Sequence, residues 1–535
     1  MRPVASCGCN CEAPADVDAS SYDQLPYTSL AFPQTHPDHL ATIARIFGLS
    51  PPNVSACRVL ELGCAGGGNV IPMAFNLPHS EFVGIDLSQQ QVQDAQTSIA
   101  ALGLRNIRIE HASIVDIDEG WGAFDYIICH GVFSWVERTV QEKILAIASG
   151  NLSANGIVYV SYNTYPGWHM RKMVRDMMRY HASQFSAPKE QVEQARALLM
   201  FLASASKDTG PYSQLLAAEA ERLSRSPDSY VFHEHLERTN LPLYFHQFIE
   251  RAEAAGLQYL SEAVVSEMLT SLFPATVAQT LERISPDLLH LEQYMDFVRN
   301  RQFRQTLLCH AAVRPTRALT PDVLHGLMMS SPAVTNTAPS DLTSGVSVTF
   351  SSGTRRAEVA SPASKAALTE LMERWPCAVD VAELLETAAD RAIPFAGGQS
   401  REEMKRAMLE DLFGGVMHGL IELHTQPPPC TNRASETPRA HPVAAFQADT
   451  GRIVVNAHHA MFELDAMAVE VLKLSDGRRR REDVIGVLME WFETGRMVLD
   501  TDGVPITDPH AARALLSDRV SAALETLTRS ALLVA

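Results

Sequence analysis

The stretch Arg58-Val-Leu-Glu-Leu-Gly-Cys-Ala-Gly-Gly-Gly-Asn69 decides the expected fold. Its first five residues form a short, largely apolar run, which is typical of one buried parallel strand. Four glycines follow within six residues, and residues 70–77 have the apolar character of a helix. A strand, a glycine turn and a helix in this order bring backbone N–H groups close to a ligand.

The segment after the turn narrows the choice of ligand. Residues 80–88 predict a second strand that ends in Asp86, where a carboxylate can bind both hydroxyls of a ribose. The turn has the order Glu-x-Gly-x-x-Gly and lacks the Lys-Ser/Thr pair of a P-loop. Glu61 would repel a pyrophosphate but suits a ligand with a cationic amino-acid group. The pattern therefore favours S-adenosylmethionine over a dinucleotide.

Composition excludes several classes of protein. A chain of 535 residues is too long for one core, so we expect several domains. No apolar run approaches the roughly twenty residues that a membrane helix needs. The net charge of −18 disfavours a nucleic-acid partner. The scattered cysteines suggest a reducing compartment, so we expect a cytoplasmic protein.

The N-terminal segment contains a Cys-x-Cys-x-Cys cluster formed by Cys7, Cys9 and Cys11. Structural metal sites usually combine such a pair with a second pair or with histidines, and no matching partner is evident in the sequence. We therefore expect no metal ion.

Five predicted strands alternate with predicted helices up to residue 165, which indicates a parallel, doubly wound sheet. Ligands bind off the carboxyl ends of the strands in such sheets. Five side chains fall at these ends and should ring one cleft: Cys64, Asp86, Ser113, His130 and Asn163.

Several stretches carry a family resemblance. The turn at 58–69, the segment His130-Gly-Val-Phe-Ser-Trp135 and the segment Ser161-Tyr-Asn-Thr-Tyr-Pro-Gly-Trp168 resemble the bacterial class I methyltransferases with a so-called regulatory domain. Further likeness lies at 22–27, 35–37, 240–245, 256–262 and 299–308. That family includes the protein-lysine methyltransferases of rickettsiae, which act on outer-membrane proteins.

The resemblance implies S-adenosylmethionine as cofactor, held by the glycine turn, with Asp86 on the ribose and Ser113 and Ile114 at the adenine. The full set of expected cofactor-binding residues is Glu61, Gly63, Cys64, Ala65, Gly66, Gly67, Asn69, Asp86, Leu87, Ser113, Ile114 and His130.

A class I methyltransferase sheet needs seven strands, and only five are apparent before residue 165. Residues 243–256 predict an amphipathic helix, and residues 257–265 and 303–310 predict two strands. We therefore interpret the "regulatory" region at 241–310 as the second half of the catalytic sheet. The helical insertion at 166–240 should form a lid over the cleft, or alternatively a homodimer interface.

The expected fold class is α/β, a Rossmann-like class I methyltransferase sheet followed by two small α+β winged-helix-like units. The predicted organisation is an N-terminal segment with a lid helix (1–50), a cofactor-binding core (51–165), the insertion (166–240), the remainder of the sheet (241–310), a linker (311–360), a middle unit (361–428) and a C-terminal unit (440–535).

The chemistry of the acceptor follows from aromatic residues on loops predicted to converge at the strand ends. They are Tyr22, Tyr27, Phe133, Trp135, Tyr165 and Trp168. A desolvated aromatic pocket lowers a lysine pKa and attracts methylated ammonium through the ring faces. His130 is the best single candidate for a general base, and a core or cofactor-contacting role is the alternative. We expect methyl transfer to a protein lysine; the alternatives are a small-molecule methyltransferase and a non-catalytic cofactor-sensing or scaffold protein.

Overall fold

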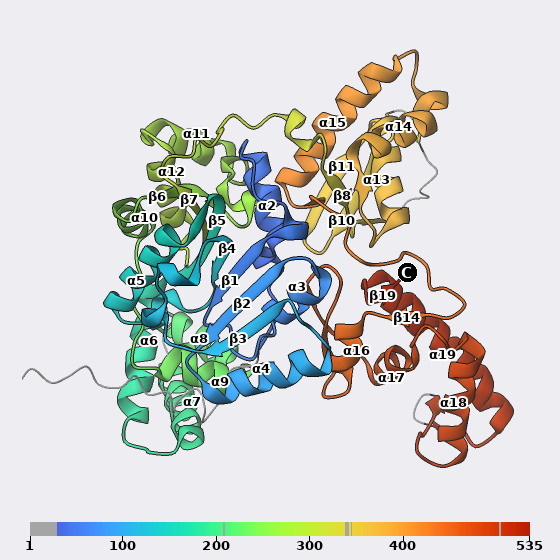
Figure 1. Ribbon diagram of the computed structural model, residues 1–535, viewed down its shortest axis with the longest axis horizontal. Coiled ribbons are helices and arrows are strands. Elements are labelled where there is room, and N and C mark those ends of the chain that lie inside the picture. Colours follow the sequence, from blue (N-terminus) through green and yellow to red (C-terminus); the bar gives the residue numbers. More distant parts are fainter. Residues whose placement is uncertain (1–28, 207–208, 337–341, 344, 502–503) are drawn as a thin grey trace, which may run out of the picture.

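The computed structural model describes residues 29–206, 209–336, 342–343, 345–501 and 504–535 (Figure 1). The candidate pocket residues Tyr22 and Tyr27, and the cluster of Cys7, Cys9 and Cys11, lie outside the described residues. Every described helix is too short or too polar to cross a lipid bilayer.

One seven-stranded sheet organises the molecule, in the order β3-β2-β1-β4-β5-β7-β6 (Figure 1). The first five strands run parallel, and β7 lies between β5 and β6 and is antiparallel to both. The sixth and seventh strands thus come from the region interpreted as the second half of the sheet. The strands are β1 (Arg58–Leu62), β2 (Glu81–Asp86), β3 (Ile107–His111), β4 (Phe124–Cys129), β5 (Leu152–Asn163), β6 (Leu257–Glu262) and β7 (Phe303–His310).

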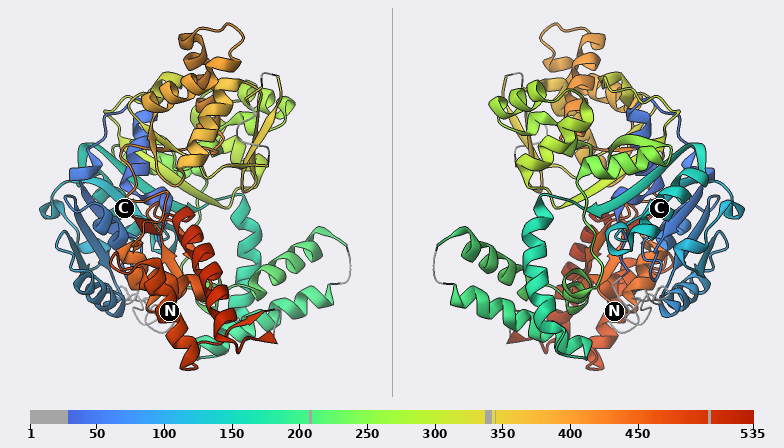
Figure 2. Two further views of the ribbon diagram at one scale, coloured as in Figure 1. Left: turned by 90° about the vertical axis from the view of Figure 1, so that its right-hand side faces the viewer. Right: turned by 90° about the vertical axis from the view of Figure 1, so that its left-hand side faces the viewer.

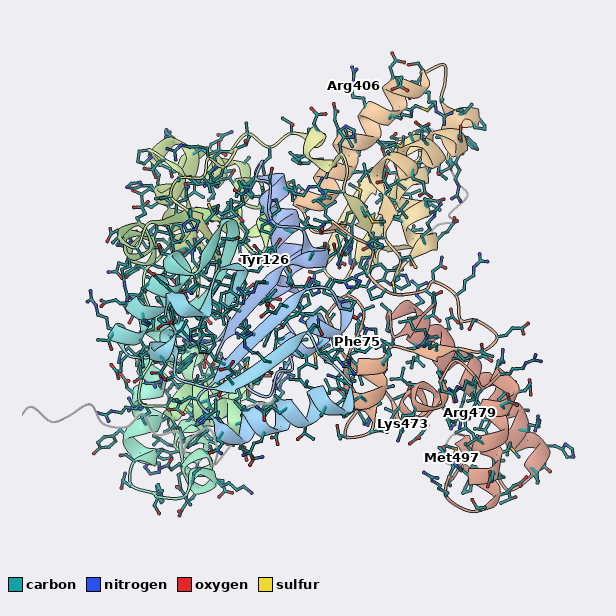
Figure 3. All side chains as sticks on the ribbon, in the orientation of Figure 1. Phe75, Tyr126, Arg406, Lys473, Arg479 and Met497 are labelled. Carbon is teal, nitrogen blue, oxygen red and sulfur yellow. The ribbon has the colours of Figure 1, made fainter. Side chains whose placement is uncertain are left out.

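Both faces of the sheet are buried, because successive strand residues point to opposite sides. Val59 faces the side covered by α2 (Pro37–Ile46), α3 (Val70–Asn76) and α4 (Gln89–Ala101). Leu60 faces the side covered by α5 (Arg138–Gly150) and α10 (Phe245–Ala254). Tyr126 lies on the α2 side, where its hydroxyl donates to the Pro52 carbonyl at 2.7 Å (Figure 3).

The insertion after β5 is helical and has its own small apolar core. Its helices α7 and α8 project from the body as an arm (Figure 2). Its helices are α6 (Gly167–Ala182), α7 (Pro188–Ala205), α8 (Pro211–Ser224) and α9 (Asp228–Val231), followed by a π-helical turn (Phe232–Leu236). A second insertion, α11 (Ala275–Ile284) and α12 (Leu288–Arg299), separates β6 from β7.

A buried ionic network fastens this second insertion to the sheet. Arg304 on β7 is fully buried and pairs with Glu262 at 2.7 Å, Asp296 at 2.8 Å and Glu292 at 3.0 Å. Its guanidinium also lies 3.9 Å from the centre of the Phe245 ring. Removal of one partner from such a network leaves uncompensated buried charge, so Arg304 is a strong structural constraint.

The middle unit continues the core on the α2 face of the sheet. Strand β8 (Met328–Ser330) falls within 311–360 and pairs with two strands of the middle unit, at 379–380 and 422–424. The other elements are β9 (Val334–Thr335), β10 (Val348–Ser352), β11 (Arg355–Val359), α13 (Pro362–Arg374), β12 (Val379–Asp380), α14 (Val381–Ala392), α15 (Arg401–Met417) and β13 (Glu422–His424).

The C-terminal unit has a separate core yet contacts the catalytic sheet. At the end of α3, Asn76 Oδ1 lies 2.8 Å from His441 Nε2, and the neighbouring Phe75 ring (Figure 3) lies 5.5 Å from the His441 ring. The unit contains β14 (Arg439–Ala440), α16 (Pro442–Ala448), β15 (Ile453–Val455), β16 (Met461–Glu463), α17 (Ala466–Leu474), α18 (Arg481–Glu493), β17 (Asp500–Thr501), β18 (Val504–Pro505), α19 (Pro509–Arg529) and β19 (Leu533–Val534).

Candidate functional site

The glycine turn after β1 is tightly packed on both sides. Gly63 and Gly67 have φ angles of +73° and +75°, which glycine adopts more readily than other residues. A Cβ at Gly63 would lie 2.5 Å from the Val132 side chain, and a Cβ at Gly68 would lie 2.5 Å from the Ser29 backbone. The Gly68 N–H donates to Ser29 Oγ at 2.7 Å. The segment from Ser29 therefore closes directly over the turn.

Asp86 is tied to the turn by backbone hydrogen bonds. Its Oδ2 accepts from the Ala65 N–H at 2.7 Å, and its Oδ1 accepts from the Ser88 N–H at 2.9 Å. Ala65 has φ of +47°, a left-handed conformation that costs an alanine about 1–2 kcal/mol. The carboxylate is thus held in one orientation at the end of β2, and the position of Ala65 is a strained one.

Glu61 is the most strongly perturbed carboxyl group of the turn. Its side chain is 3% exposed, and Oε1 accepts a 2.6 Å hydrogen bond from Asn69 Nδ2. Oε2 is buried and has no hydrogen-bond partner among the described residues. Burial raises the pKa of Glu61 to about 8, although the Asn69 bond opposes the shift. A cationic ligand group would supply the missing partner, which fits the ammonium of S-adenosylmethionine.

Asn69 joins the turn to two distant segments. Its Oδ1 accepts from the Phe32 N–H at 3.0 Å and lies 2.9 Å from His459 Nε2. His459 belongs to the C-terminal unit, on the loop between β15 and β16. The sequence analysis missed both partners, because local patterns carry no signal for a contact between residues 390 positions apart.

The side of the site assigned to the adenine is more open. Ser113 and Ile114 are half-buried after β3, and the Ser113 N–H donates to Asp116 Oδ2 at 3.3 Å. Leu87, directly after Asp86, is 39% exposed. Cys64 is buried, and burial raises the pKa of its thiol well above the usual value. A Cβ at Gly84 would lie 2.7 Å from Cys64 Sγ, so the thiol fills the space beside this glycine.

His130 lies at the end of β4, within the predicted ring of strand ends. Its Nδ1 is 2.9 Å from the Tyr159 hydroxyl, and its ring centre is 3.9 Å from that of Phe32. Burial lowers the pKa of His130 to about 4, so the imidazole is neutral at neutral pH. A group with this pKa is a weak proton acceptor, which favours a role in shaping the pocket over a role as general base.

The predicted aromatic residues fall into different environments. Phe133 is fully buried and packs edge-on against Phe248 at 5.3 Å, which is a core environment. Trp135 is partly exposed and meets the buried Trp168 in a T-shaped contact at 6.2 Å. The structure thus brings the two tryptophans together and places Phe133 within the packed interior.

Tyr165 belongs to a second aromatic group. Its ring stacks on His169 at 4.0 Å and lies 5.3 Å from the Tyr244 ring. The Tyr244 hydroxyl is 3.1 Å from His169 Nε2. His169 and Tyr244 were not in the predicted set, although Tyr244 stands in a stretch that contributed to the family resemblance.

Asn163 ends β5 beside these groups. Its backbone N–H donates to Ser134 Oγ at 2.9 Å. The Asn163 side-chain Nδ2 is buried without a hydrogen-bond partner among the described residues. A buried donor of this kind is available to a polar ligand atom at the strand ends.

Comparisons with known proteins agree with this geometry. Residues 53–213 match the family described as a methyltransferase domain, residues 227–310 the predicted methyltransferase regulatory domain, and residues 436–532 the C-terminal winged helix domain of PKMT. The uncharacterized protein RP789 of Rickettsia prowazekii is 34% identical over 533 residues, which cover 97% of this chain and 94% of that protein.

Solved structures show the same likeness. The structure of PKMT2 from Rickettsia typhi in complex with AdoHcy is 31% identical and has a TM-score of 0.86, covering 95% of this chain and all of that chain. A second structure of PKMT2 from Rickettsia typhi is 30% identical and has a TM-score of 0.84.

The sheet order, the glycine turn and the matched domain define a class I S-adenosylmethionine-dependent methyltransferase. Within that class, the chain belongs to the family with a regulatory domain and a C-terminal winged helix, which includes rickettsial PKMT2.

Proposed function

We propose that this methyltransferase transfers methyl groups from S-adenosylmethionine to the ε-amine of lysine in a protein acceptor. The observation that carries the proposal is the likeness to PKMT2 along the whole chain, from the cofactor-binding sheet to the C-terminal winged helix. Small-molecule methyltransferases need no such C-terminal unit. The architecture of the whole chain and the aromatic site together support a protein as the methyl acceptor.

Four groups of the chain would hold the cofactor. Glu61 would face the ammonium, Asp86 the ribose hydroxyls, and Ser113 and Ile114 the adenine. The unpartnered Oε2 of Glu61 supports the first assignment, and the rigid hold on Asp86 supports the second. When bound, S-adenosylmethionine supplies an electrophilic methyl group on a sulfonium.

The acceptor amine must be neutral, because an ammonium has no lone pair to attack a methyl group. The partly buried rings of Tyr165 and Tyr244, with the exposed His169 stacked on Tyr165, would displace water from a lysine and lower its pKa. His130 is too weak a base to keep the released proton, so the proton passes to solvent. Positioning and dehydration would then account for most of the rate.

The remaining units would dock the acceptor. We propose the units at 361–428 and 440–535 as docking modules beside the catalytic region at 51–310, with the insertion at 166–240 as a lid. The net charge of −18 would attract a cationic protein segment. An outer-membrane protein, as for the rickettsial relatives named in the family resemblance, is the acceptor to test first, encountered in the cytoplasm before export.

The test supplies methyl-labelled cofactor to the enzyme with a bacterial extract divided into proteins and small molecules. The proposal expects label in the protein fraction, and none when the extract proteins are first treated to block their amines. Label confined to the small-molecule fraction would instead favour the natural-product alternative. Cofactor binding without transfer to either fraction would favour a cofactor-sensing protein.

A further inference from the structure

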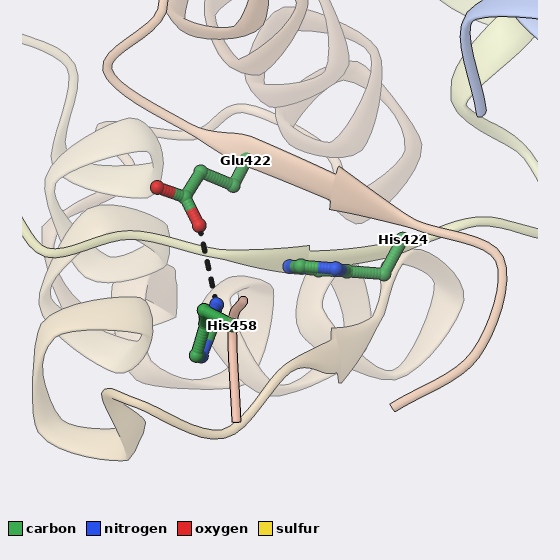
Figure 4. A group of neighbouring side chains, drawn as sticks. All are labelled: Glu422, His424 and His458. Carbon is green, nitrogen blue, oxygen red and sulfur yellow. Dashed lines mark ion pairs between the residues drawn. The ribbon is translucent and has the colours of Figure 1, made fainter. Parts of the chain in front are cut away.

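A group of potential metal ligands lies away from the cofactor turn. Glu422 and His424 stand on β13 of the middle unit, and His458 stands on the loop between β15 and β16 of the C-terminal unit (Figure 4). One ligand atom from each lies within 4.8 Å of the other two. All three line a cavity of about 600 Å³ that is also bordered by α2.

The hydrogen bonds on the outer side of His458 fix its tautomer. His458 Nε2 lies 2.8 Å from the Pro376 carbonyl oxygen, which can only accept, so Nε2 carries the hydrogen. Nδ1 therefore directs a lone pair at Glu422 Oε2, 3.3 Å away, whenever the imidazole is neutral. A proton on Nδ1 makes this contact an ion pair with Glu422, and a metal cation held between the two groups would satisfy both of them in place of that proton.

His424 has the corresponding arrangement. Its Nδ1 lies 3.3 Å from Asp38 Oδ2 on α2, so the carboxylate can accept the Nδ1 hydrogen. The other ring nitrogen, Nε2, then carries a lone pair, and the His424 ring lies beside the pair of Glu422 and His458 (Figure 4). Ser330 Oγ lies 2.9 Å from this nitrogen, and its hydroxyl can rotate. Ligating histidines usually have such a carboxylate or carbonyl partner on the opposite nitrogen.

We infer that Glu422, His424 and His458 bind one divalent transition-metal ion, with zinc the best match, at the junction of α2, the middle unit and the C-terminal unit. Two imidazole nitrogens and one carboxylate oxygen form a ligand set that zinc accepts. Zinc bonds of about 2.0–2.2 Å place ligand atoms about 3.3–3.6 Å apart, a spacing that Glu422 and His458 already have. The Glu422 side chain is 47% exposed and lines the cavity together with His424. It can therefore turn toward His424 when an ion binds.

The ion would fasten three parts of the chain. Asp38 holds His424 from α2 and also accepts the Thr425 N–H at 2.9 Å, so it would orient a ligand without touching the ion. The residue after His458 is His459, which contacts Asn69 in the cofactor turn. Metal binding would therefore immobilise the loop that reaches the turn. The sequence analysis weighed only the N-terminal cysteines as metal ligands; Glu422, His424 and His458 come from two separate segments, which no local pattern connects.

The test uses the full chain in a Cys7→Ser, Cys9→Ser, Cys11→Ser background, since those thiols could bind zinc themselves. The protein is stripped with a chelator and titrated with zinc chloride in a calorimeter. We expect one zinc ion per chain, and at least about 100-fold weaker binding in His458→Ala and in Glu422→Gln. Asp38→Asn should weaken binding about 10- to 100-fold.

His79→Ala is the matched control, because His79 lines the same cavity but lies outside the cluster. It should bind zinc as the parent does. Zinc should also raise the unfolding temperature of the parent but not of Glu422→Gln. Because the Glu422 side chain is exposed, this substitution should leave the fold intact, so a missing zinc effect would reflect the lost ligand. Cobalt(II) should give the intense visible bands of a low-coordinate nitrogen and oxygen site. Equal zinc uptake by the parent and by Glu422→Gln would overturn the inference. A loss of zinc binding in His79→Ala as large as that in the ligand variants would overturn it as well.

Discussion

The strongest prediction concerns the proton on Glu61. With a pKa of about 8, this carboxyl group is mostly protonated at pH 7 in the cofactor-free protein. A cationic ammonium binds the carboxylate form far better, because the charge-assisted contact then replaces an unpartnered oxygen. Binding of S-adenosylmethionine should therefore release close to one proton at pH 7.

The magnitude follows from the ionised fraction of Glu61. With a pKa of about 8, that fraction falls from about one half at pH 8 to about one hundredth at pH 6, so the apparent affinity should fall about 50-fold. In Glu61→Gln the affinity at pH 8 should be roughly 10- to 100-fold weaker, since a charged hydrogen bond contributes about 1.5–3 kcal/mol. At pH 6 the parent and the variant should converge.

Titration calorimetry in buffers of different ionisation enthalpy measures both the affinity for S-adenosylmethionine and the number of protons released on binding. The ligand ammonium titrates as well, with an ordinary pKa of about 7.7–8.0, so the ratio of the parent to Glu61→Gln is the quantity to follow. Glu119→Gln, an exposed change outside the turn, is the control: the ratio of the parent affinity to the Glu119→Gln affinity should be one at every pH. An equal pH dependence in the parent and in Glu61→Gln would refute the assignment of Glu61 to the ammonium.

Stability without cofactor provides an independent readout of Glu61. Its folded-state pKa lies above the ordinary value of 4.5, so the unfolded chain loses this proton first as the pH rises. The parent should therefore lose about 1.4 kcal/mol of stability per pH unit, relative to Glu61→Gln, between about pH 4.5 and 8. Denaturant unfolding of the two proteins across this range measures the difference.

Four further changes test other parts of the account. Asp86→Ala should weaken cofactor binding by about 2–4 kcal/mol in the same calorimeter, since it removes charged hydrogen bonds to the ribose; an unchanged affinity would exclude that role. Ala65→Gly should stabilise the cofactor-free protein by about 1 kcal/mol in denaturant, because it relieves left-handed strain; a loss of stability would contradict the strain. Trp135→Ala should reduce turnover about tenfold, or ~1.4 kcal/mol, with little change in cofactor affinity, and equal losses of both would count against its place at the acceptor. Arg304→Ala should cost about 3–5 kcal/mol of unfolding free energy, whereas the exposed Arg314→Ala should cost little, and similar values for the two would show that the buried network is weak.

Much of the fold could be predicted from the sequence, because the deciding signals are local. The glycine turn, Asp86 at the end of β2 and the alternation of strands and helices all lie within short windows. The strand at Phe303–His310 could be placed because a seven-stranded class I sheet needs two strands beyond the five that precede residue 165. The winged-helix-like character of the C-terminal unit was also predicted, and its main helices are α17, α18 and α19.

The site was harder to predict, because its details depend on contacts between distant segments. Nothing near His459 indicates that its ring reaches Asn69, and nothing near Ser29 indicates that its backbone closes over Gly68. Phe133 stands in the same stretch as Trp135, yet one side chain is in the core and the other is partly exposed. Burial also decides protonation, and the low pKa of His130 could not be read from its neighbours in sequence.

The acceptor atom is the most direct test of the central proposal. Protein methylated with labelled S-adenosylmethionine should be hydrolysed in acid and its amino acids separated. The account predicts that the label is recovered as N-methylated lysine. Recovery in methylated arginine or histidine, or loss of the label as methanol from carboxyl esters, would contradict it.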